Sequence, residues 1–185
     1  MCSELQDLFR ADQDDRMYHP DYGTPEYRLL RERDAERRKR LEAIIASGGL
    51  KVPEDYYHAA WILNHGESSG EIWQAHILAK EAVKLGLHRG RWLAAAAYDR
   101  WLMYQGRPQK YGTQIVPDGK QQRVWDVEPA TSDVERAEWD VPPLAEMERR
   151  AEELTRNETM PPMETAPEWL KDALLRWRAE DEGRA

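Results

Sequence analysis

The stretch SSGEIWQAHILAKEAVKLGLHRGRWLAAAAYDRWLMYQG, residues 68–106, decides the fold class of this chain. Ser68 followed three residues later by Glu71 is a capping box, and it marks the start of a helix that we expect to end near Gly86. A second helix follows a short glycine-containing turn and ends at Gly106. Its run of alanines allows two antiparallel helices to approach closely, so the stretch predicts a helical hairpin.

Helix signals continue on the N-terminal side of this hairpin. Thr24 followed by Pro25 is an N-cap with proline at the first helical position, and the helix that it begins should end at Gly48 and Gly49. Pro53 begins the next helix, PEDYYHAAWILNH, which Gly66 ends. The basic run RERDAERRKR, residues 31–40, lies in the first of these helices. Acidic residues interleave it, which is typical of a solvated helix face.

A different pattern follows the helical hairpin. YGTQIV and QQRVWDVE are two short runs with β-branched or aromatic members, separated by Pro117, Asp118, Gly119 and Lys120. Pro-Asp-Gly is a turn signal because proline presets φ, aspartate bonds its own backbone and glycine accepts a positive φ. We therefore predict a β-hairpin at about residues 111–128. Ser132 with Glu135 forms another capping box, Pro142–Pro143 starts a helix through Leu154, and Pro167 opens a last amphipathic helix.

The fold class predicted is mainly α, a helical bundle with tetratricopeptide-like helical hairpins plus one β-hairpin. Three regions are expected: an N-terminal extension at 1–23, a helical domain at 24–155, and a linker with the C-terminal amphipathic helix at 156–185. The linker is rich in proline and poor in apolar residues, so we expect the last region to be an arm separable from the core. Its helix offers a face for a homodimer.

Composition narrows the function classes. The chain has 185 residues, which suits one domain, and Cys2 is the single cysteine, which excludes a disulfide framework and a cysteine-based zinc site. No run of 18 apolar residues is present, and the N-terminus is acidic where a signal peptide is basic and then apolar. We expect a cytoplasmic protein with no membrane partner. The net charge of -8 repels a polyanion, which makes nucleic acid an unfavourable partner.

Helical spacing indicates where a site could lie. His58, Trp61 and His65 recur at i, i+3 and i+7 and share one helix face. On the second helix of the hairpin, Asp99 lies on the same face as Trp92, and this face is otherwise apolar. A buried carboxylate needs a partner, and we expect His65, His76 or a donor from residues 109–114. A structural reading stands beside this one, since a single buried histidine commonly satisfies the core and Asp99 could simply bond the hairpin backbone.

The polar run after Gly106 is the other half of the predicted site. Together with the helices it would wall a small polar pocket, although the same side chains could simply cap helix ends and a sheet edge. His65 and Asp99 are the predicted catalytic residues. The residues predicted to contact a substrate are His58, Trp61, Gln74, His76, Trp92, Arg100, Gln109, Tyr111, Thr113 and Gln114. No cofactor and no bound metal are expected.

The motifs HAAWILNHGESSGEIWQAHILAKEAVKLG and RWLAAAAYDRWLMYQGRPQKYGTQ, followed by DVERAEWDVPPLAEM, carry a resemblance. The chain resembles, over about residues 25–154, an uncharacterised bacterial domain family. Its members share a histidine-bearing helix end, an Asp-Arg pair on the last helix and a terminal QxYGTQ box. Glu67 stands where that family often has aspartate, and Asn64 where glutamine is common. The family has no established reaction, so the resemblance implies a site and not a function.

Three functional classes remain open. The first is a small enzyme using non-covalent general acid–base chemistry on a small organic substrate, for example in specialised metabolism, as a hydrolase, cyclase or isomerase. In it His65 transfers the proton and Asp99 orients it. The second is a tetratricopeptide-like module that binds a peptide without catalysis. The third is a metal-dependent enzyme with ligands such as His58 and His65. The sequence has no P-loop, GxGxxG, GxSxG or HExxH motif, which disfavours nucleotide-dependent and covalent serine chemistry.

Overall fold

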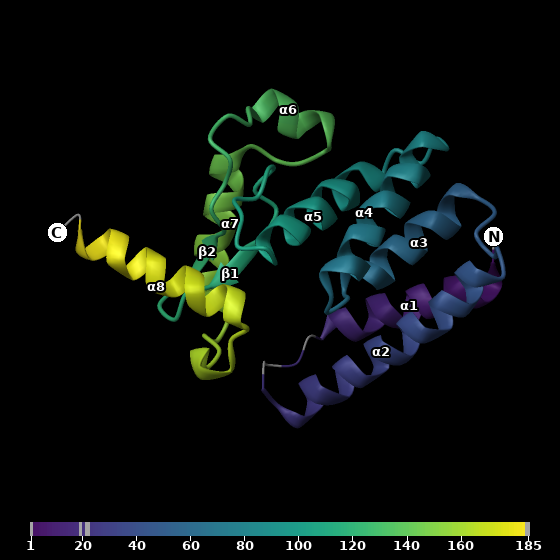
Figure 1. Ribbon diagram of the computed structural model, residues 1–185, viewed down its shortest axis with the longest axis horizontal. Helices are drawn as coiled ribbons and strands as arrows, with labels where there is room; N and C mark the ends of the chain where they lie inside the picture. Colours follow the sequence, from purple (N-terminus) through teal and green to yellow (C-terminus); the bar gives the residue numbers. More distant parts are fainter. Residues whose placement is uncertain (1, 19, 21–22, 184–185) are drawn as a thin grey trace.

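The computed structural model describes residues 2–18, 20 and 23–183, and it confirms a mainly α fold with one small β-hairpin (Figure 1). In the described part of the chain, no helix is long and apolar enough to cross a membrane. The elements are α1 (Ser3–Met17), α2 (Pro25–Ala46), α3 (Pro53–Asn64), α4 (Ser69–Lys84), α5 (Gly90–Met103), β1 (Ile115–Pro117), β2 (Gln122–Val124), α6 (Asp133–Glu138), α7 (Leu144–Asn157), the short 3-10 helix η1 (Met163–Thr165) and α8 (Glu168–Glu182).

Helices α3, α4 and α5 run antiparallel to their neighbours and form the centre of a bundle (Figure 1). The four alanines of α5, residues 94–97, are all buried, so the predicted close approach of small residues is confirmed. Gly90 begins α5 against α4, where an added Cβ would lie 3.1 Å from Val83 and 3.2 Å from the carbonyl oxygen of Ala79. Small residues therefore set the α4–α5 distance.

The predicted helix starts rest on the capping contacts that the sequence indicated. The Ser68 hydroxyl accepts a hydrogen bond from the backbone N–H of Glu71, whose carboxylate accepts one from the N–H of Ser68. The Thr24 side chain accepts from the N–H of Tyr27 at the start of α2. Side-chain caps fix these boundaries locally, which is why they could be predicted without tertiary information.

The N-terminal region is not a simple extension. Helix α1 packs against α2 and α3, and Leu5 lies fully buried in one core cluster with Leu41, Ile62 and Leu63. The cluster buries apolar surface that stabilises the docked helix. Residues Ser3–Met17 therefore pack against the helical bundle, within the region that the sequence predicted as an N-terminal extension.

The β-hairpin lies where it was predicted, but its strands are short. Ile115 pairs with Val124 and Pro117 with Gln122 in an antiparallel register. In the turn, the Asp118 carboxylate accepts hydrogen bonds from the N–H groups of Lys120 and Gln121, and Gly119 has a φ of 89°. Beyond these strands, Gln114 still accepts from the backbone N–H of Trp125, and Gln109 forms an isolated parallel bridge with Val127. Asp99 holds the backbone of the residues between them, as described below.

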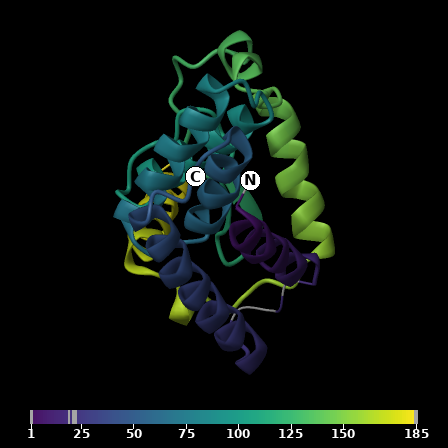
Figure 2. The same cartoon turned by 90° about the vertical axis from the view of Figure 1, so that its right-hand side faces the viewer.

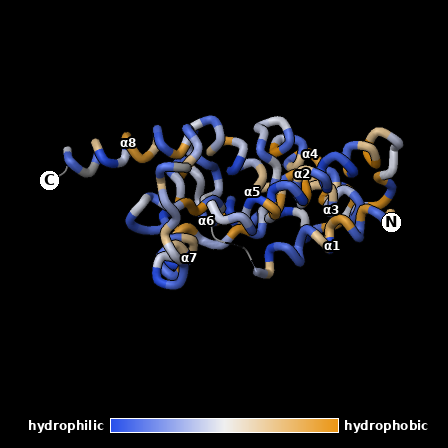
Figure 3. The backbone as a smooth tube through the Cα atoms, turned by 90° about the horizontal axis from the view of Figure 1, so that it is seen from below, coloured by the Kyte–Doolittle hydropathy of each residue, from blue (hydrophilic) through white to orange (hydrophobic). Residues whose placement is uncertain are grey.

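Helix α8 is not a free arm. Leu170, Leu174 and Trp177 are buried in a second core cluster against Val116 and Trp125 of the hairpin region. The Trp177 indole N–H donates to Asp126 at 2.8 Å. The sequence signal underestimated this helix because its apolar partners lie in the hairpin, far from it along the chain. Figure 2 shows α7 along one side of the molecule, and Figure 3 shows α8 at the end of the molecule opposite the start of α1.

The basic run at residues 31–40 is also corrected. Asp34, Arg37 and Arg38 are buried, so this face of α2 is not a solvated one. The apolar periodicity of the sequence did not reveal it, because the buried side chains are charged. They contact α1 and the segment after α3, and this arrangement positions the candidate site.

Candidate functional site

Asp99 is buried in α5 and accepts four hydrogen bonds from the segment that follows the helix. The backbone N–H groups of Lys110, Tyr111 and Thr113 donate at 2.8–3.0 Å, and the Thr113 hydroxyl donates at 2.8 Å. Burial raises the pKa of Asp99, while these four donors favour the ionised carboxylate and oppose that rise. The expectation that Asp99 bonds a donor from residues 109–114 is confirmed, and its role in this geometry is to hold the loop.

The side chains of Gln109 and Gln114 add further hydrogen bonds to the same loop. We call the four hydrogen bonds to Asp99, together with these contacts, the Asp99 clamp. The fully buried Gln109 side chain accepts from the N–H of Gln114 and donates to the carbonyl oxygens of Gln114 and Trp125. Gly112 between them has a φ of 88°, a conformation that glycine adopts readily. The Tyr111 carbonyl oxygen accepts from the guanidinium of Arg136. Side chains inside and outside the polar run therefore provide hydrogen-bond partners for its backbone groups.

His65 pairs with Asp12, and not with Asp99 as expected. His65 Nδ1 lies 3.1 Å from each carboxylate oxygen of Asp12, which projects from α1. The pairing to Asp99 was wrong because four donors already surround that carboxylate, and because α1 was not recognised as part of the bundle. Asp12 is the functional candidate that sequence reasoning missed. A signal was present: Leu5, Asp12 and Arg16 recur at helical spacing on one face.

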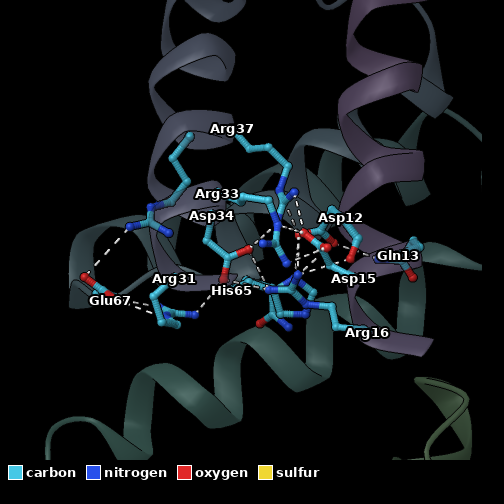
Figure 4. Close-up of polar contacts among 12 residues, drawn as sticks. Asp12, Gln13, Asp15, Arg16, Arg31, Arg33, Asp34, Arg37, His65 and Glu67 are labelled. Atoms are coloured by element: carbon cyan, nitrogen blue, oxygen red, sulfur yellow. Dashed lines mark hydrogen bonds and ion pairs between the residues drawn. The ribbon is translucent and has the colours of Figure 1, made fainter. Parts of the chain in front are cut away.

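Asp12 belongs to an ion-pair cluster between α1, α2 and the start of α4 (Figure 4). Arg16 and Arg37 lie 2.9 Å and 2.6 Å from Asp34, and Arg38 lies 2.7 Å from Glu71. We define the ion-pair cluster as Asp12, Asp15, Arg16, Arg31, Arg33, Asp34, Arg37, Arg38, Glu67 and Glu71. It fixes the Asp12 carboxylate, since Arg16 lies 3.2 Å from it and the Gln13 amide donates to it.

The surroundings of His65 keep its imidazole neutral. Burial lowers the pKa of His65, Asp12 opposes this effect, and the positive charges of Arg16 and Arg100 lower the pKa further. Asp12 as an acceptor assigns the imidazole proton to Nδ1. Nε2 then carries the lone pair, and no hydrogen bond to it is found within the described part of the chain. The side chain is 15% exposed, and among the described residues Nε2 is not one of the buried side-chain atoms that lack a partner.

The predicted shared face of α3 turns toward α1 and α5. The His58 ring stacks on Phe9 at 4.2 Å between ring centroids, and Trp61 lies 5.8 Å from His65 and 5.9 Å from Trp92. Burial lowers the pKa of His58. Among the described residues, buried polar atoms without a hydrogen-bond partner include His58 Nδ1, Trp61 Nε1 and Asn64 Oδ1, all on this helix.

His76 and Gln74 are among the predicted site residues for which no contact with His65 is found in the described stretches of the chain. His76 donates through Nδ1 to the carbonyl oxygen of Ala94 and packs beside Tyr98, so it links α4 to α5. Gln74 is exposed on α4. The structure thus brings together His65, Trp61, Trp92, Arg100 and Gln114, and it places His76 and Gln74 elsewhere.

The hairpin lines cavities, but not where they were expected. One cavity of about 510 Å³ lies between the end of α5 and α8, lined by Tyr104, Trp125 and Trp169. Another of about 460 Å³ lies between β2 and α7. The lining of neither cavity includes His65 or residues 109–114.

Metal ligation finds no support in the described residues, where no group of three or more histidine, cysteine, aspartate or glutamate side chains could hold an ion. No protein-family model, curated protein or solved structure matches the chain. The resemblance drawn from the QxYGTQ box therefore stays a prediction.

Proposed function

We propose that the protein is a small enzyme that uses non-covalent general acid–base chemistry on a small organic substrate, with His65 as the proton-transferring group. The observation that supports this most is the Asp12–His65 pair. Both Asp12 oxygens lie 3.1 Å from Nδ1, which leaves Nε2 as the free nitrogen of an imidazole with a fixed orientation.

Asp12 takes the orienting role that the sequence assigned to Asp99. It is almost fully buried and held by Arg16 and Gln13, so the imidazole position is well defined. A neutral imidazole at neutral pH serves as a base toward a substrate proton or a water molecule. The imidazolium that forms is stabilised by the Asp12 carboxylate and returns the proton to the product. Hydrolase, cyclase or isomerase chemistry each needs this step.

A peptide-binding module is the second candidate. Trp73 and Ile77 on α4 are exposed, and Trp73 packs against Trp101 of α5 at 4.6 Å between ring centroids. Exposed apolar side chains at helical spacing favour a protein partner on this outer face. Binding there would be lost in Trp73→Ala and retained in His65→Gln, which separates the two candidates.

The enzyme proposal is tested with a panel of esters, lactones, amides, epoxides and enolisable ketones. For any substrate that turns over, His65→Gln should lower the rate about 10²–10⁴-fold. His88→Gln is the matched control, since His88 is exposed and lies elsewhere. An activity that survives His65→Gln unchanged would reject the proposed role of His65.

A further inference from the structure

Arg100 sits beside the Asp12–His65 pair without a carboxylate partner. It follows Asp99 on α5, and its guanidinium donates from Nη1 to the backbone oxygen of Asn64 at 2.8 Å and from Nε to the Gln114 side chain at 3.2 Å. Both acceptors are neutral. Within residues 2–18, 20 and 23–183, Arg100 takes part in no ion pair of 4.0 Å or less.

The neighbouring arginines differ in this respect. Arg16, Arg31 and Arg37 lie within 2.9 Å of Asp34, Arg33 pairs with Asp15, and Arg38 pairs with Glu71. The ion-pair cluster holds as many carboxylates as guanidinium groups, so it is balanced in itself. Arg100 adds a positive charge that these carboxylates do not match.

Asn64 lies at the same end of α3 and, within the part of the chain that the structure describes, has an unpaired acceptor atom. Its side chain is 4% exposed, and its Oδ1 has no donor among the described residues. It precedes His65, and its backbone oxygen is the atom that Arg100 binds. An amide oxygen only accepts hydrogen bonds, so this atom needs an N–H or O–H donor, and a ligand at this position would have to carry a donor beside its anionic group.

We propose that the substrate of this site carries an oxyanionic group, a carboxylate or a phosphate, which binds the guanidinium of Arg100 beside Nε2 of His65. This inference rests on the proposed function. Arginine has five N–H donors, and the two contacts above use Nε and Nη1, so the proposed oxyanion would pair with the remaining N–H groups. Gln114 and the Asn64 carbonyl fix the guanidinium plane, which gives the QxYGTQ box an indirect role in positioning Arg100.

Oxyanion binding has a consequence for His65. The charged groups that act on the imidazole are Asp12 and Arg16 from α1 and Arg100 from α5. Because Arg100 lowers the pKa of His65, an oxyanion that neutralises Arg100 raises it. The bound substrate therefore makes His65 a stronger base than it is in the free protein.

The test is a pH titration of the His65 ring signals by NMR in the full chain. Inorganic phosphate and acetate are the probes, and chloride at equal ionic strength is the control. We expect either probe to raise the pKa of His65 in a saturable way, and phosphate against acetate distinguishes the preferred oxyanion. Arg100→Gln should raise the pKa of His65 in the free protein and weaken probe binding about tenfold or more.

Arg149→Gln is the matched control, because Arg149 is an exposed arginine on α7 with a single weak contact to Glu146. Arg100→Lys keeps the charge but loses bidentate geometry, and it serves if Arg100→Gln does not fold. No probe-dependent change in wild type, or the same change in Arg100→Gln or Arg100→Lys, overturns the inference. The acid–base proposal fails separately, if activity survives His65→Gln.

Discussion

His65 and Asp12, 53 residues apart in the chain, form a contact in which one imidazole nitrogen meets both oxygens of a buried carboxylate. It joins the end of α3 to the middle of α1. The contact explains why α1 belongs to the bundle and why the site depends on a segment that looked peripheral.

The ion-pair cluster should be costly to break at its centre. Asp34 is buried, and Arg16, Arg31 and Arg37 converge on it, so Asp34→Asn removes a buried carboxylate that three guanidinium groups share. We expect a loss of about 3–5 kcal/mol in the free energy of unfolding. Asp7→Asn is the control, because Asp7 is 72% exposed and its pair with Arg10 is a surface contact. Urea denaturation measures both, and equal effects would contradict the assignment.

The Asp99 clamp predicts a graded effect. Asp99→Asn presents an amide N–H to backbone donors, and we expect about 2–4 kcal/mol of destabilisation with faster hydrogen exchange at residues 109–114. Thr113→Val removes one donor of the four and should cost about 1 kcal/mol. Exchange in 109–114 that is unchanged in Asp99→Asn would show that the clamp does not hold the loop.

Helix α8 provides a matched pair on one element. Trp177 is buried against Trp125, whereas Leu175 on the same helix is 64% exposed. Trp177→Ala should destabilise the protein by about 3–5 kcal/mol, and Leu175→Ala by about 0.5 kcal/mol or less. If Trp177→Ala instead leaves thermal unfolding unchanged, the C-terminal region is the separable arm that the sequence suggested.

Stability should fall as the pH drops below about 6.5. Burial lowers the pKa of His58, His65 and His76 from 6.5, so between their lowered values and 6.5 the unfolded chain binds more protons than the folded one. Their contribution is complete above 6.5 and is lost on acidification, at up to about 1.4 kcal/mol per pH unit for each histidine. Asp34, whose pKa is lowered from 3.8, acts only below this window. Denaturation at pH 7.5, 6.5 and 5.5 checks the slope, and a flat or inverted profile would count against it.

Local chemistry made much of the fold predictable. The Ser68–Glu71 and Thr24–Pro25 caps, the alanine run of α5 and the Asp118–Gly119 turn each act within a few residues, so the sequence alone carries them. The helix face with His58, Trp61 and His65 was also foreseen. Spacing along a single helix could not indicate which carboxylate meets His65, because that depends on how distant helices pack.

The failures share one physical cause. Helix α1 and residues 34–38 bury charged side chains, and a search for apolar periodicity treats a charged face as solvated. Opposite charges from different helices neutralise each other there, which only the tertiary structure reveals. The linker sequence before α8 likewise gave no sign that this helix packs on the protein, since the partners of Trp177 lie in the hairpin region.

The central claim is that His65 is an oriented, neutral base with an accessible Nε2. The rate at which diethyl pyrocarbonate modifies His65, followed by mass spectrometry from pH 5 to 8, tests this most directly, with exposed His88 in the same molecule as the reference. We predict that His65 is modified, with a midpoint below the ordinary histidine pKa of 6.5, and that Asp12→Asn moves the midpoint lower because it removes the carboxylate that raises the pKa. A His65 that does not react, or that has a midpoint at or above 6.5 and is insensitive to Asp12→Asn, would contradict the account.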